Sequence, residues 1–83
     1  METTDIQKLI ETGLPGAQAY VTGDGTHFEA LVVCAAFAGK RMLERHRMVY
    51  ATLGDRMQGA IHALSIRSFT PEEWKRAGHA EST

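Results

Sequence analysis

The chain has 83 residues, a formal net charge of −1 and 43% hydrophobic residues, which suits one small folded domain and excludes a large internal substrate chamber. The near-neutral charge gives no overall attraction to polyanions, and the single cysteine excludes an internal disulfide. No long apolar run resembles a signal peptide or a membrane span, so we expect a cytoplasmic protein with no membrane partner.

The first part of the chain predicts a helix followed by a β-hairpin. Thr3 or Thr4 can cap a helix that stops at Gly13. Small, β-branched and aromatic residues alternate over residues 17–22 and again over 27–34, which predicts two strands. The Gly-Asp-Gly sequence between them is an ordinary hairpin signal.

The middle of the chain predicts a helical crossover to a third strand. The following residues recur at helical spacing and share one side of the helical segment: Met42, His46, Val49, Tyr50, Leu53 and Met57. Its charged residues fall largely on other sides, namely Arg41, Glu44, Arg45 and Arg47. Gly54 can divide the segment into two helices, and Gly59 ends it. Residues 61–69 then alternate again, with His62 and Leu64 on one face.

A short last helix is predicted by its start signals. Thr70 is a good N-cap, Pro71 suits the first helical position, and Glu73 completes a capping box. Phe69 and Trp74 have the spacing of a hydrophobic staple across this start.

The order of the elements predicts an α+β fold, a three-stranded mixed sheet with helices packed on one face. We expect a single domain over residues 1–76 and a flexible tail over residues 77–83.

The GDGTHF sequence lacks both the lysine and the following helix of a phosphate loop, so a hairpin turn is favoured. His27 lies beside this turn, and His62 opens the third strand, so the two rings can approach each other if these strands are neighbours. Two histidines do not complete a metal site, and any metal would be shared with another molecule.

The remaining candidate groups are interpreted structurally. His46 is expected to be half-buried and hydrogen-bonded to a neighbour, and Cys34 to be a buried apolar thiol. No arrangement of catalytic side chains is visible, so we expect no enzyme.

A basic face on the long helical segment is the candidate for DNA or partner contact. Lys40, Arg41, Arg45 and Arg47 form it, while Glu44 interrupts it. Such charge runs are more often a solvated face than a nucleic-acid interface.

Four stretches together resemble the BolA family, in particular its short YrbA/IbaG branch. They are GDGTHFEALVVCAAFAGK, RHRMVYATL, IHALSI and TPEEW, in the order and spacing of that family. The resemblance covers nearly the whole chain and implies a class II KH-like fold with the order αββααβα.

The resemblance implies a non-enzymatic partner of monothiol (CGFS) glutaredoxins that shares a bridging [2Fe-2S] cluster and holds none when alone. In that arrangement glutaredoxin and glutathione supply sulfur ligands, and the histidine of the HAL motif, here His62, supplies a nitrogen. Family members carry the second ligand in the loop between the first two strands, where this chain offers His27 as first choice and Asp24 as a poor second. Ligation by His62 alone stays open.

The resemblance also implies an alternative to a cluster adaptor. It is a DNA-binding transcriptional regulator of stress response or cell envelope, acting through the helix-turn-helix-like segment over residues 37–57. The glycine loop of KH domains is absent there, which weakens direct nucleic-acid recognition. A third possibility is cluster-free binding, through the same surface, to glutaredoxin or to a second copy as a homodimer.

Overall fold

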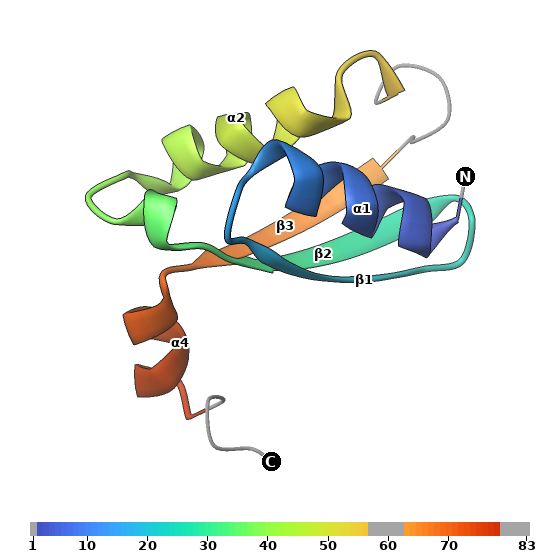
Figure 1. The fold of residues 1–83 in the computed structure, drawn as a ribbon. Helices are drawn as coiled ribbons and strands as arrows, with labels where there is room; N and C mark the ends of the chain where they lie inside the picture. Colours follow the sequence, from blue (N-terminus) through green and yellow to red (C-terminus); the bar gives the residue numbers. More distant parts are fainter. Residues whose placement is uncertain (1, 57–62, 79–83) are drawn as a thin grey trace.

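The computed structural model describes residues 2–56 and 63–78. Its elements in chain order are helix α1 (Thr3–Gly13), strands β1 (Gln18–Gly23) and β2 (His27–Val33), the 3-10 turn η1 (Ala35–Phe37), helix α2 (Met42–Leu53), strand β3 (Ala63–Phe69) and helix α4 (Pro71–Arg76). The predicted α+β class is therefore confirmed (Figure 1). His62, the second half of the crossover and most of the expected tail lie outside the described residues.

The sheet has the strand order β1-β2-β3. A tight hairpin makes β1 antiparallel to β2, whereas the crossover through α2 makes β3 parallel to β2. The sheet is thus mixed, as predicted. Helices α1 and α2 lie on one face of it, and α4 leaves the end of β3 on the other side (Figure 1). No helix in the described ranges is long and apolar enough to cross a membrane.

The core lies between the sheet and the pair α1 and α2. Alternation along β2 buries Phe28, Ala30 and Val32, as the sequence predicts. The buried cluster consists of Ile6, Ile10, Leu14, Ala19, Phe28, Ala30, Val32, Cys34, Phe37, Val49 and Leu53. Cys34 is 1% exposed, which confirms its interpretation as a buried thiol.

The predicted buried face of α2 is partly wrong. Helix α2 buries Arg45, Val49 and Leu53, while Met42 is 59% exposed and Tyr50 is 37% exposed. The Tyr50 hydroxyl instead reaches the Leu64 carbonyl oxygen, at 3.5 Å, beside β3. An arginine can occupy a buried position on a helix because its long apolar stem packs against its neighbours while its guanidinium binds polar partners.

Candidate functional site

The turn between β1 and β2 is held by its own aspartate. Asp24 Oδ1 accepts the backbone N–H of His27 at 2.8 Å and that of Thr26 at 2.9 Å. These two donors lower the pKa of the Asp24 carboxyl, that of His27 having the larger effect. The predicted hairpin is confirmed, and the Asp24 carboxylate is already occupied by the turn.

Both glycines of the turn have a structural reason. Gly25 has φ of 96°, a conformation that residues with a side chain rarely adopt. A Cβ on Gly23 would lie 2.4 Å from Cδ1 of the Phe28 ring, so this position requires the missing side chain. The glycines of GDGTHF therefore serve the turn and the close packing beside it.

His27 opens β2, the central strand of the sheet, beside this turn. Its side chain is exposed, on the face of β2 opposite the buried Phe28. In the parallel register His27 pairs with Ala63, the residue that follows His62 in the sequence. The condition that β2 and β3 are neighbours is therefore met, while His62 itself lies outside the described residues.

The described part of the chain offers few metal donors near the turn. In residues 2–56 and 63–78, no group of three or more His, Cys, Asp or Glu side chains can hold a metal ion. His27 offers one exposed imidazole, and Cys34 is buried. Imidazole is a known ligand of iron-sulfur centres, and His27 is an exposed imidazole at this end of β2.

His46 is half-buried, as predicted, but its expected hydrogen bond is missing at one nitrogen. Nε2 of His46 is buried and has no hydrogen-bond partner among the described residues. His27 lies on the face of β2 opposite the buried Phe28, whereas helix α2, which carries His46, covers the other face (Figure 1), so the two side chains do not form one site.

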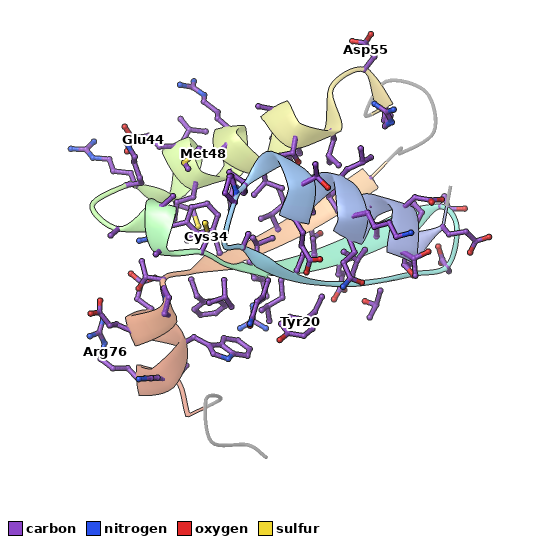
Figure 2. The ribbon with its side chains drawn as sticks, viewed as in Figure 1. Tyr20, Cys34, Glu44, Met48, Asp55 and Arg76 are labelled. Atoms are coloured by element: carbon purple, nitrogen blue, oxygen red, sulfur yellow. The ribbon has the colours of Figure 1, made fainter. Side chains whose placement is uncertain are left out.

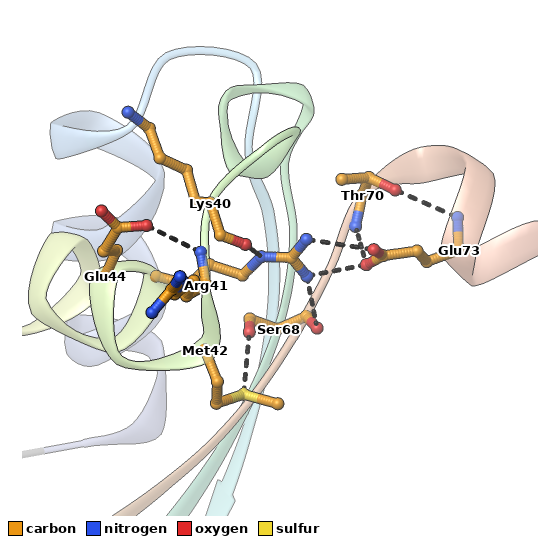
Figure 3. Close-up of polar contacts among 8 residues, drawn as sticks. Lys40, Arg41, Met42, Glu44, Ser68, Thr70 and Glu73 are labelled. Atoms are coloured by element: carbon orange, nitrogen blue, oxygen red, sulfur yellow. Dashed lines mark hydrogen bonds and ion pairs between the residues drawn. The ribbon is translucent and has the colours of Figure 1, made fainter.

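An ion pair between Arg45 and Glu73 joins α2 to α4 (Figure 3). Arg45 donates from Nη1 to Glu73 Oε1 at 2.7 Å and from Nη2 to Oε2 at 3.0 Å. Glu73 Oε1 also accepts the Thr70 backbone N–H at 2.9 Å, which confirms the predicted capping box. Mainly because of the Arg45 hydrogen bonds, the pKa of Glu73 falls to about 2.

This pairing corrects the candidate DNA contacts. Arg45 was expected on an exposed side of the helix, but it is only 9% exposed and its guanidinium is bound to Glu73. Its pKa is raised, chiefly by that hydrogen bonding. Lys40, Arg41 and Arg47 remain exposed. Glu73 was recognised in the sequence only as a capping residue, since pairing across 28 positions has no local signal.

The family comparison matches most of the chain. A protein-family model described as BolA-like protein matches residues 11–73 of this chain. Acid stress protein IbaG of Escherichia coli K12 is 35% identical over 77 residues, which cover 92% of each protein. The solved structure of a bolA protein homologue from Coxiella burnetii has a TM-score of 0.85 and 49% identity, covering 92% of this chain and 99% of that one.

Two other relatives are longer than the region they share with this chain. BolA-like protein 1 of Bos taurus is 43% identical over 60 residues, and the chain spans 44% of its length. DNA-binding transcriptional regulator BolA of Escherichia coli K12 is 40% identical over 53 residues, and the chain spans 50% of its length.

Proposed function

Because this chain belongs to the BolA-like protein family, we propose that it is a non-enzymatic adaptor that binds a monothiol glutaredoxin and shares a bridging [2Fe-2S] cluster with it. In this proposal the partner and glutathione contribute the sulfur ligands, and this chain contributes the imidazole of His62. The adaptor would serve cluster trafficking or the sensing of iron and redox state.

The observation that supports the proposal most is the register at the start of β2 and β3. His27 pairs with Ala63, so an exposed imidazole lies beside the residue that follows His62. Asp24 is a weaker second ligand than His27, because its carboxylate already accepts two backbone N–H groups. We therefore propose His62 as the principal ligand and His27 as the second one.

The orientation of β2 sets a condition on this pair. His27 lies on the outer face of the sheet, whereas Leu64, two positions after His62, packs against the core. His27 would therefore reach the proposed cluster at the end of β2 beside the hairpin turn, and not through the face that the helices cover.

The test measures the cluster spectrum when the protein is added to cluster-loaded monothiol glutaredoxin. The wild-type chain should change the visible absorption and circular dichroism, because an imidazole enters the iron coordination. The variant His62→Ala should lose most of this change, and His27→Ala should lose a smaller part. The control His79→Ala removes a histidine from the predicted tail and should behave as wild type.

Binding and ligation are separated by calorimetry with cluster-free glutaredoxin. His62→Ala should bind that partner as the wild type does, because only the metal ligand has been removed. A His62→Ala spectrum identical to the wild-type spectrum would contradict the assignment of His62 as a ligand. A cluster spectrum that does not change when the wild-type chain is added would contradict the shared cluster itself.

A DNA-binding regulator is the second candidate, favoured by the three exposed cations Lys40, Arg41 and Arg47 at the start of α2. It predicts binding to duplex DNA whose affinity falls steeply with salt, and a shallower salt slope for Lys40→Glu or Arg47→Glu. Arg45 is not used for this test because its loss would disturb the pair with Glu73. Affinity no higher than that of a neutral control protein at physiological salt would remove this candidate.

A further inference from the structure

The face of the sheet opposite α1 and α2 is largely open. Tyr20 points away from those helices and is 54% exposed (Figure 2). The strand registers place the following side chains on this outer face: Gln18, Tyr20, Thr22, His27, Glu29, Leu31, Val33, Ala63, Ser65, Arg67 and Phe69. Helix α4 covers only one end, where the Trp74 ring meets Phe69 edge to face at a centroid distance of 5.2 Å.

The open part of this outer face contains a shallow hollow of about 380 Å³. Its lining side chains come from all three strands: Tyr20, Thr22, Glu29, Leu31, Ser65 and Arg67. Tyr20 and Leu31 are directly opposite each other in the β1–β2 register. The hollow therefore has an aromatic and aliphatic centre with one acidic and one basic side chain beside it.

The two charged side chains of the hollow have no ion-pair partner within the described part of the chain, where the ion pair is Arg45 with Glu73. Glu29 pairs with Ser65 and Leu31 with Arg67, so the two charges are on neighbouring strands, two positions apart. The Arg67 guanidinium lies over the Phe69 ring, 5.6 Å from its centroid. An unpaired carboxylate and an unpaired guanidinium thus share one exposed patch.

We propose that the outer face is the interface of a two-fold symmetric homodimer, in which Glu29 of each protomer pairs with Arg67 of its partner. The two-fold axis lies between the two protomers, parallel to the sheet and perpendicular to the line that joins Glu29 to Arg67. Rotation about this axis places the Glu29 carboxylate of each protomer opposite the Arg67 guanidinium of the other. Leu31 lies near that axis and supplies the apolar centre. A surface that carries both signs of charge in this way is complementary to itself.

The same charges disfavour other occupants of the hollow. A nucleic acid would bring its phosphates against the Glu29 carboxylate, and an acidic peptide would meet the same repulsion. A basic peptide would be repelled by Arg67. A second copy satisfies both charges at once, because it presents each of them to the opposite one.

The size of the face predicts a weak dimer. Strands of six and seven residues at a rise of about 3.3 Å are roughly 20 Å long, and three strands about 4.8 Å apart are roughly 14 Å wide. Such a face is smaller than the roughly 800 Å² per partner of a standard stable interface. We therefore expect association at high micromolar concentration that weakens as salt is added.

Charge reversal tests the proposed pairing by sedimentation equilibrium at low salt. Glu29→Arg and Arg67→Glu, each alone, place like charges opposite each other and should weaken the dimer by roughly tenfold or more. An equimolar mixture of the two variants should form a heterodimer, because both contacts then join opposite charges. The double variant Glu29→Arg/Arg67→Glu should recover the homodimer for the same reason.

The control Asp55→Arg makes the same charge change at an exposed position just after α2, away from the outer face of the sheet, and should leave the association unchanged (Figure 2). Association in the mixture also shows that the two single variants are folded. A wild-type chain that stays monomeric up to millimolar concentration would overturn the proposal. Single variants that dimerise like the wild type, or a mixture that fails to associate, would also overturn it.

Discussion

At the scale of single residues, Arg45 ties three parts of the chain together. Its Nε donates to the Lys40 carbonyl oxygen at 3.0 Å, and its two terminal nitrogens bind Glu73 on α4. The guanidinium also lies over the buried Phe37 ring, 5.8 Å from its centroid. Removal of Glu73 would leave a charge that is only 11% exposed without its carboxylate, so this pair anchors α4 to the domain.

The Glu73 pair predicts a defined loss of stability in acid. Its folded-state pKa of about 2 lies below the ordinary 4.5, so its contribution is complete above the ordinary value and disappears as the pH falls from 4.5 toward 2. At neutral pH, Glu73→Gln should lower the melting temperature by several degrees. The difference from wild type should close across that acid range when thermal unfolding is followed by circular dichroism.

The matched control is Glu72→Gln, which removes a carboxylate from the adjacent, exposed position of the same helical turn. It should change the melting temperature far less at neutral pH. A gap between wild type and Glu73→Gln that stays constant from pH 7 to pH 2 would contradict the pairing as the source of stability.

At the scale of elements, the β1–β2 turn depends on the Asp24 side chain more than on its charge. Asp24→Ala removes the acceptor of both the Thr26 and the His27 backbone N–H groups, whereas Asp24→Asn keeps a carbonyl oxygen in the same place. Native-state hydrogen exchange should show a large loss of protection at these two amides in the alanine variant and a small loss in the asparagine variant.

The amides of Val32 and Val33, at the far end of β2, serve as the internal reference for this experiment. Their protection should change little, because the turn opens locally before the sheet does. Equal loss of protection along the whole of β2 in Asp24→Ala would mean that the side chain stabilises the fold globally and not the turn.

At the scale of the whole molecule, stability rests on a thin core in which Phe37 is the largest fully buried side chain. Phe37 is completely buried, and Phe37→Ala should lower the free energy of unfolding by about 3–5 kcal/mol through lost burial and the cavity left behind. A domain of this size has a total of only about 5–15 kcal/mol, so the variant should unfold at a much lower urea concentration.

The control for the core is Leu43→Ala, because Leu43 lies on α2 and is itself 60% exposed. Its free energy of unfolding should stay within about 0.5 kcal/mol of wild type in the same urea titration. A loss for Leu43→Ala as large as that for Phe37→Ala would show that α2 packs differently from the arrangement in Figure 1.

Local sequence patterns were sufficient to predict most of the helices and strands of this molecule. Alternation identified the buried side of β2, glycine spacing identified the hairpin, and the Thr70 start signals identified α4. The first cap was predicted less well, since Glu2 and not a threonine precedes helix α1. These features could be predicted because each depends on residues a few positions apart. The family resemblance added the expected role of His62, which stays a prediction.

Tertiary structure alone decided which polar residues are free and which are occupied. The burial of Arg45, its pairing with Glu73 and the two unpaired charges of the outer face all join residues far apart in the chain. The closeness of His27 to the start of β3 likewise comes from a parallel register that the crossover sets. The sequence by itself determined the elements and their order, because local patterns encode them. The availability of each charge was decided by packing, which local patterns do not record.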